Sequence, residues 1–167
     1  MDEFYRLFTA FHLTDTDKQP FTNANLQKHW TMLFFGFTSC NSVCPLTMAE
    51  LAKMYRILVK HRVTTLPQVF MISLDPQHDD LARLKQYVLA FDKHFKGATS
   101  TNETITAMTH ELGIAYMNVK TPTKTIEHTG TILLFNPQGE LNAFFTMPHH
   151  AAWLAADFLW IDQTYHL

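Results

Sequence analysis

The sequence predicts an α/β fold, in which helices cover a central sheet. Two nearly unbroken apolar runs, at residues 30–37 and 69–74, have the composition of strands that are buried on both faces. A stretch with helical spacing of its apolar residues follows each run, and this alternation of strand and helix is typical of an α/β sheet. With 167 residues, of which 47% are apolar and 17% charged, the chain is long enough for one well-packed core. We therefore expect residues 1–167 to form a single domain.

An N-terminal β-hairpin is predicted ahead of the first apolar run. Residues 8–13 alternate well enough for a short strand, residues 15–20 form a cluster of turn-forming residues, and Phe21 begins the returning strand. Residues 23–29 then have the character of a short helical turn.

Three helices are predicted in the middle of the chain. The first covers residues 45–60, because Pro45 suits the first turn of a helix, where its missing N–H is no loss. Asp79 is predicted to cap the second helix. Ser100 and Glu103 predict a capping box for the third, which follows the second with no strand between them.

The last third of the chain is predicted to return to strands. Residues 114–119 have the character of another short strand. Residues 131–135 and 141–145 are predicted to form a hairpin around the turn at residues 136–139. A final helix is expected over residues 151–161.

Composition excludes several classes of protein. A formal net charge of −2, without any run of basic residues, argues against a nucleic-acid partner. Two cysteines are too few for a disulfide scaffold. No apolar stretch approaches the length of about 20 residues that spans a bilayer, and the first residues do not resemble a secretory signal. A cytosolic protein and a sequence that begins after an anchor remain open at this point.

The two cysteines, Cys40 and Cys44, lie at the junction of the first apolar run and the helix that follows it. Cys44 is expected at or near the helix N-terminus, where unpaired amide groups and the helix dipole favour a thiolate over a thiol. The spacing permits two thiolates to hold a metal ion, and it also permits a disulfide after a small local adjustment. A static disulfide or a pair of buried thiols is a further reading, although a structural disulfide stabilises most when it closes a longer loop.

Four segments resemble, in order, the motifs of one protein family. They are Phe11-His12-Leu13-Thr14-Asp15 with Pro20-Phe21-Thr22, Phe35-Gly36-Phe37-Thr38-x-Cys40-x-x-x-Cys44-Pro45, Ile72-Ser73-Leu74-Asp75-Pro76-x-x-Asp79, and His128-Thr129 followed by Asn136-Pro137-x-Gly139. The family is Sco/SenC, whose members are thioredoxin-fold proteins that supply copper to the dinuclear copper centre of cytochrome c oxidase. The resemblance implies a thioredoxin-like central sheet flanked by helices, with the N-terminal β-hairpin as an addition.

The resemblance also implies a copper site formed by Cys40, Cys44 and His128. Two soft thiolates favour Cu(I), and an added imidazole allows Cu(II) to be held as well. Such a ligand set leaves one side of the ion open for transfer to another protein. Asp75, after the second apolar run, and Glu127, beside the histidine, are candidates for tuning or orienting the ligands or for contacting a partner. Asp75 is equally well explained as a turn residue.

The loop between the cysteines departs from the family. Many members have Cys-Pro-Asp-Val-Cys, whereas this chain has Asn41-Ser42-Val43 between the two cysteines. The difference changes the flexibility and the charge of the loop.

The predicted function is that of a copper metallochaperone rather than an enzyme in the strict sense. The protein would dock on the copper-bearing subunit of cytochrome c oxidase and transfer one copper ion by ligand exchange. Other copper chaperones and thiol oxidoreductases are further expected partners. The resemblance implies a location on the periplasmic side of the bacterial inner membrane, with a membrane anchor ahead of these 167 residues in the full-length protein.

Two other functions would use the same cysteines. In a thiol–disulfide oxidoreductase that reduces partner cysteines, Cys40 would attack as the more exposed thiol and Cys44 would resolve the mixed disulfide. This reaction does not require His128. A thiol peroxidase is the third reading, but the spacing from Thr38 to Cys40 is one residue shorter than in peroxidatic Thr-x-x-Cys sites, and no arginine is evident nearby in the sequence.

Met147, His149 and His150 form a cluster ahead of the last predicted helix. Thioether and imidazole groups could bind a second metal ion weakly there. A solvated entry to the helix explains the same residues and is the favoured reading.

Overall fold

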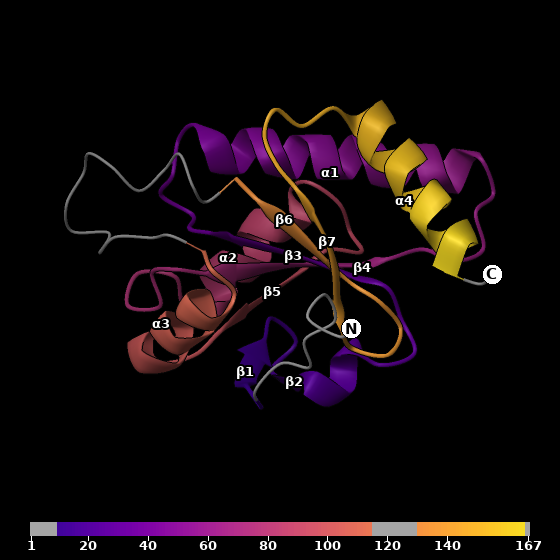
Figure 1. The fold of residues 1–167 in the computed structure, drawn as a ribbon. Helices are drawn as coiled ribbons and strands as arrows, with labels where there is room; N and C mark the ends of the chain where they lie inside the picture. The colour runs from indigo at the N-terminus through magenta and orange to yellow at the C-terminus, as the bar shows by residue number, and fades with distance from the viewer. Residues whose placement is uncertain (1–9, 115–129, 166–167) are drawn as a thin grey trace.

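A mixed sheet lies at the centre of the computed structural model, which describes residues 10–114 and 130–165. Its seven strands have the spatial order β2-β1-β5-β4-β3-β6-β7 (Figure 1). The strands are β1 (His12–Asp15), β2 (Pro20–Thr22), β3 (Thr31–Gly36), β4 (Gln68–Ser73), β5 (Lys96–Thr99), β6 (Ile132–Phe135) and β7 (Leu141–Phe145). With helices on both faces of this sheet, the predicted α/β class is confirmed.

Strand β3 is the centre of the sheet. It pairs in parallel with β4 on one side and antiparallel with β6 on the other. Met32 and Phe34 belong to one buried apolar cluster, whereas Leu33 and Phe35 belong to the cluster on the opposite face. Burial on both faces explains why the sequence shows a continuous apolar run here rather than alternation.

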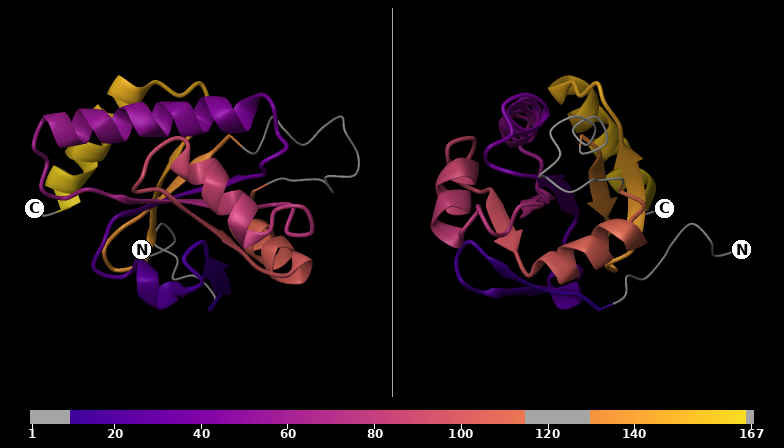
Figure 2. Two further views of the ribbon diagram at one scale, coloured as in Figure 1. Left: turned by 180° about the vertical axis from the view of Figure 1, so that it is seen from behind. Right: turned by 90° about the vertical axis from the view of Figure 1, so that its left-hand side faces the viewer.

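Helices enclose the sheet from both sides. They are η1 (Asn23–Leu26), α1 (Val43–Lys60), α2 (Leu81–Leu89), α3 (Asn102–Glu111) and α4 (Ala151–Tyr165). Residues of α1, α2 and α4 pack in the first cluster, and residues of α3 and η1 pack in the second. The right-hand view of Figure 2 accordingly has α1 and α4 together on one side of the sheet and α3 on the opposite side.

The predicted N-terminal hairpin is confirmed, although its first strand is displaced along the chain. β1 begins at His12 and extends through Asp15, and it pairs antiparallel with β2. The Asp15 carboxylate accepts hydrogen bonds from the amides of Asp17 and Gln19, at 2.8 and 3.0 Å, and thereby closes the turn. β1 also pairs with β5, so the hairpin extends the central sheet.

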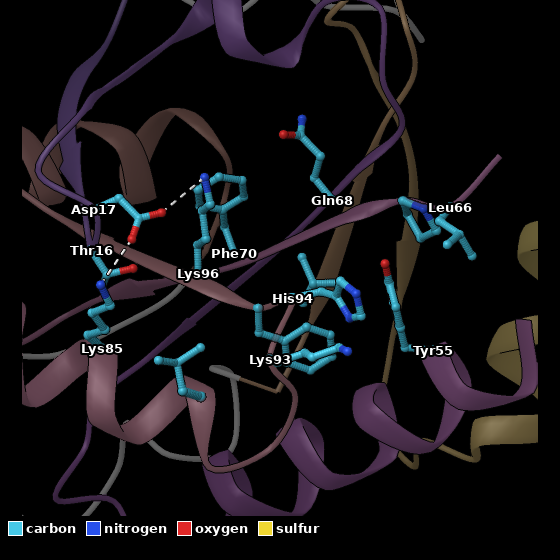
Figure 3. Close-up of a pocket in the computed structure, with 14 residues that line it drawn as sticks. Thr16, Asp17, Tyr55, Leu66, Gln68, Phe70, Lys85, Lys93, His94 and Lys96 are labelled. Atoms are coloured by element: carbon cyan, nitrogen blue, oxygen red, sulfur yellow. Dashed lines mark hydrogen bonds and ion pairs between the residues drawn. The ribbon is translucent and has the colours of Figure 1, made fainter. Parts of the chain in front are cut away.

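A pocket of about 400 Å³ lies where this hairpin turn meets the body of the protein (Figure 3). Asp17 forms ion pairs there with Lys85 at 3.1 Å and with Lys96 at 3.3 Å. Hydrogen bonds from Lys85 and Lys96 lower the pKa of the Asp17 carboxyl group. These contacts connect the hairpin turn to α2 and β5.

Strand β5 was not expected from the sequence. Its four residues, Lys-Gly-Ala-Thr, have neither apolar alternation nor a β-branched run, so their β propensity is low. The strand forms because β4 and β1 pair with it on either side. Gly97 is required for packing, since a Cβ atom at this position would lie 2.6 Å from Cδ2 of Leu84 on α2.

Two boundaries differ from the prediction by one or two residues. α1 begins at Val43, two residues before Pro45. α3 is capped by Thr101 rather than by Ser100, because the Thr101 hydroxyl accepts a hydrogen bond from the Thr104 amide at 3.2 Å. Of the predicted strand at residues 114–119, Ile114 is not in a strand and the remainder lies outside the described residues.

The predicted C-terminal hairpin and final helix are both present. β6 and β7 pair antiparallel, and α4 extends to Tyr165. The Trp30 indole donates a hydrogen bond to the Asp162 carboxylate at 2.9 Å, and its ring meets that of Phe158 edge to face. These contacts fix α4 to the chain just before β3.

Candidate metal centre

The two cysteines lie where β3 ends and α1 begins. A turn closed by a hydrogen bond from the Cys40 amide to the Phe37 carbonyl, 3.2 Å long, leads into the helix. Cys44 is the second residue of α1 and is fully buried, whereas Cys40 is 6% exposed. Both cysteines are free, with no disulfide between them. Gly36 leaves room for the second sulfur, because a Cβ atom there would lie 2.9 Å from Cys44 Sγ.

The two sulfurs interact directly. The Cys44 thiol donates a hydrogen bond to Cys40, and this contact is the main reason that the pKa of Cys40 is lowered to about 5. Burial opposes the shift, and the amides of Ser42 and Cys44 and the Ser42 hydroxyl group support it. The hydrogen bond to Cys40 and burial raise the pKa of Cys44. The pair therefore carries one thiolate and one thiol at neutral pH.

The thiolate is on Cys40, whereas the position of Cys44 at the helix N-terminus predicted that Cys44 would be ionised. Cys44 lies in the first turn of the helix as predicted, but the amides at the helix start act on the sulfur of Cys40. A sulfur that approaches a helix N-terminus from the preceding loop meets the unpaired N–H groups, whereas a side chain within the first turn points away from them into the core.

Asp79 holds the loop that carries Cys40. Its carboxylate is fully buried and accepts hydrogen bonds from the Thr38 amide at 3.0 Å, the Thr38 hydroxyl at 2.5 Å and the Ser73 hydroxyl at 2.8 Å. The predicted role of Asp79 as a helix cap is wrong. Asp80 caps α2 instead, because its carboxylate accepts a hydrogen bond from the Arg83 amide at 2.8 Å.

Arg83 brings a guanidinium group to the same loop. Its Nε donates to the Thr38 hydroxyl at 2.9 Å. The absence of a nearby arginine in the sequence was one argument against a thiol peroxidase, and the fold removes that argument. The short spacing from Thr38 to Cys40 remains.

Tyr87 of α2 also faces this region, although it was not predicted from the sequence. Its hydroxyl oxygen is fully buried and has no hydrogen-bond partner within residues 10–114 and 130–165. Burial raises the pKa of Tyr87, and electrostatic interactions with Cys44, Cys40 and Asp79 raise it further. No local signal distinguishes this tyrosine from the other aromatic residues of the chain, because its position depends on how α2 packs.

The other predicted site residues have different outcomes. Asp75 lies in the turn after β4, where its amide donates to the Ser73 hydroxyl at 3.1 Å and its carboxylate lies 3.5 Å from Nδ1 of His78. These contacts agree with its reading as a turn residue. Glu127 and His128 lie outside the described residues. In the part of the chain that the structure describes, no group of three or more His, Cys, Asp or Glu residues could hold a metal ion.

The described geometry fits a soft metal ion. Two sulfurs in hydrogen-bond contact, of which one is already ionised, can become a pair of thiolate ligands when the second proton leaves. The same pair can form a disulfide after a small adjustment of the loop.

Comparison with known proteins places the chain in a family. The SCO1/SenC family model matches residues 2–161. A protein of Stutzerimonas stutzeri is 30% identical to this chain over 146 residues, which are 86% of this chain and 71% of that protein. Its name describes it provisionally as a copper-binding protein. An SCO2-like protein of Rickettsia felis is 30% identical over 134 residues, which are 78% of this chain and 64% of that protein. The chain thus spans about two thirds of the length of these relatives.

A solved structure of a Sco protein is also similar to this chain. The crystal structure of Arabidopsis thaliana ScoI with copper bound is similar with a TM-score of 0.86 and 26% sequence identity, and the match covers 96% of this chain and 100% of that one. The predicted thioredoxin-like architecture is therefore confirmed. Because the family model matches nearly the whole sequence, the chain belongs to the SCO1/SenC family.

Proposed function

We propose that this protein is a copper metallochaperone that binds one copper ion through Cys40, Cys44 and His128 and delivers it to the dinuclear copper centre of cytochrome c oxidase. The observation that carries the proposal is the pair of adjoining free cysteines at the end of β3, one of them ionised at neutral pH. Two thiolates are soft ligands that select Cu(I), and an imidazole allows Cu(II) to be held as well.

The relatives support this proposal. The family takes part in cytochrome c oxidase assembly, and the Arabidopsis thaliana ScoI crystal contains copper. A further support comes from Gly130, which follows His128 by two positions in the sequence. A Cβ atom on Gly130 would lie 3.3 Å from Cγ1 of Val43, the residue before Cys44. Gly130 therefore lies next to the start of α1.

The thiols determine how binding would depend on pH. Cys40 is ionised above a pH of about 5, whereas Cys44 must lose its proton when the metal binds. Copper affinity is therefore expected to fall as the pH decreases, since protons compete with the metal for sulfur. Transfer would proceed by exchange of these ligands for those of the copper-bearing oxidase subunit.

Titration of the reduced protein with Cu(I), in competition with a chromogenic chelator, tests the proposal. We expect uptake of one equivalent, loss of that uptake in Cys40→Ser and Cys44→Ser, and weaker binding in His128→Ala. Protein with the cysteines oxidised to a disulfide should bind little copper and serves as a chemical control. Absence of stoichiometric uptake, or uptake that is unchanged in Cys40→Ser, would contradict the proposal.

A second function, reduction of cysteines in a partner, is favoured by the asymmetry of the two thiols. Cys40 has the thiolate character of an attacking sulfur and is the less deeply buried of the pair, whereas the protonated, fully buried Cys44 suits the resolving role. We expect His128→Ala to retain dithiol reductase activity toward a partner disulfide while it loses copper affinity. Equal loss of both would indicate that the two functions are not separable.

We further propose that the protein acts on the periplasmic side of the bacterial inner membrane, held there by an anchor in the full-length chain. Other copper chaperones and thiol oxidoreductases are proposed as partners alongside the oxidase subunit. Among the described helices, none is long and apolar enough to cross a membrane. Fusion of a reporter enzyme that is active only in the periplasm to the full-length protein tests this location, and an inactive fusion would contradict it.

A further inference from the structure

Two potential copper ligands converge on Gly130 from the connection between β7 and α4. In Figure 1 this connection passes over α1. The side chain of Met147 packs against Gly130, and its sulfur and Cγ are the nearest atoms to the space that a Cβ atom would occupy. The imidazole of His149 meets the same residue, since Nε2 is hydrogen-bonded to the Gly130 carbonyl. A thioether and an imidazole therefore both contact this one residue.

The hydrogen bond of His149 determines its tautomer. A carbonyl oxygen can only accept, so Nε2 carries the proton and Nδ1 of the neutral ring carries the lone pair. Nδ1 is fully buried and has no hydrogen-bond partner among the described residues. Metal-binding histidines usually donate their other ring N–H to a backbone carbonyl or a carboxylate in this way. The ring is thus already in the form that binds a metal through Nδ1.

Met147 supplies a second soft ligand. The residue is 45% exposed, and its sulfur packs against Gly130. Thioether sulfur favours Cu(I) over harder ions. Val43, which precedes Cys44, lies against the same face of Gly130 as Met147. The thioether is therefore next to the start of α1, which carries Cys44.

His150 is a different case. Its ring packs against Trp153, with ring centroids 4.1 Å apart. It is exposed, and none of its atoms is among the three nearest to the Cβ position of Gly130. This neighbouring histidine provides a matched control.

We propose that Met147 and His149 form a second, weaker Cu(I) subsite that adjoins the dithiol centre and through which the ion enters or leaves it. The proposal rests on the copper-binding function proposed above. Neither ligand has to lose a proton on binding, because the thioether has none and Nδ1 already carries a lone pair.

Equilibrium binding to protein without the dithiol tests the subsite. In the Cys40→Ser/Cys44→Ser background we expect one weakly bound Cu(I) ion, measured with a low-affinity chelator. Met147→Leu, which keeps the volume, and His149→Gln, which keeps a donor for the Gly130 carbonyl, should each lower the affinity by about tenfold or more, or about 1.4 kcal/mol. His150→Ala should leave it unchanged. Equal losses in His150→Ala and His149→Gln would overturn the assignment.

Loading of the protein with intact cysteines provides a measurement that does not depend on the folding of the double variant. Met147→Leu and His149→Gln should slow the transfer of Cu(I) into the dithiol centre in stopped-flow experiments, without changing the affinity of that centre. Unchanged loading rates, with normal uptake at the cysteines, would overturn the subsite and leave the proposed function intact. Absence of Cu(I) uptake by the unaltered protein would instead contradict the proposed function itself.

Discussion

Replacement of Cys44 by alanine is expected to move the ionisation midpoint of Cys40 from about pH 5 to near the ordinary cysteine value of about 8.5. The hydrogen bond donated by the Cys44 thiol is the largest contribution to the low pKa of Cys40, and burial acts in the opposite direction. Once this donor is removed, the thiolate is stabilised only by the amides and the Ser42 hydroxyl group at the start of α1, and burial opposes them.

The ultraviolet absorbance of the thiolate, followed against pH, measures this midpoint directly. Ser42→Ala is a suitable control, because it removes only the smallest of the contacts that stabilise the Cys40 thiolate and should shift the midpoint much less. Alkylation rates at one pH are a poorer measure, since a thiolate becomes less nucleophilic as its pKa falls. A midpoint near pH 5 in Cys44→Ala would disprove the assigned hydrogen bond.

Replacement of Asp79 by alanine is expected to lower the free energy of unfolding by about 3 kcal/mol or more, since a single hydrogen bond to a charged group contributes about 1.5–3 kcal/mol. The carboxylate accepts hydrogen bonds from the Thr38 amide and from the hydroxyls of Thr38 and Ser73. Ser73 is fully buried, so water cannot readily replace the lost partner. Urea denaturation monitored by circular dichroism measures the loss.

Asp80→Ala is the matched control for this prediction. The two residues are adjacent and chemically identical, but Asp80 is an N-cap, whose replacement by alanine typically lowers stability by about 1 kcal/mol. Asp79→Ala should also release the loop that carries Cys40 and make its alkylation faster, whereas Asp80→Ala should not. Equal effects of the two substitutions on stability and alkylation would contradict the role assigned to Asp79.

The pair Asp79 and Asp80 also illustrates which features could be predicted from the sequence. β3, β4 and the start of α1 were predictable because continuous apolar runs and a proline in a first helical turn are local signals. Either aspartate could have capped α2. The packing of β4 against the cysteine loop determines which of the two turns inward, and it is Asp79 that meets Thr38 and Ser73.

The candidate site was predictable to a similar extent. The spacing of Cys40 and Cys44 at a strand–helix junction is visible in the sequence. The contact of Arg83 with Thr38 spans 45 residues, and the buried hydroxyl of Tyr87 reaches the same region from α2. Such contacts depend on how α2 crosses the sheet, and that crossing depends on Gly97 in β5, the strand that the sequence did not predict.

The hydrogen bond between the two sulfurs also determines how many protons the reduced cysteine pair carries. Above a pH of about 5 the reduced pair holds one proton rather than two, so formation of the disulfide releases one proton together with two electrons. The midpoint potential of such a couple changes by about 30 mV per pH unit, whereas that of two ordinary thiols changes by about 60 mV. The reducing power of this protein should accordingly respond only half as steeply to the acidity of its surroundings.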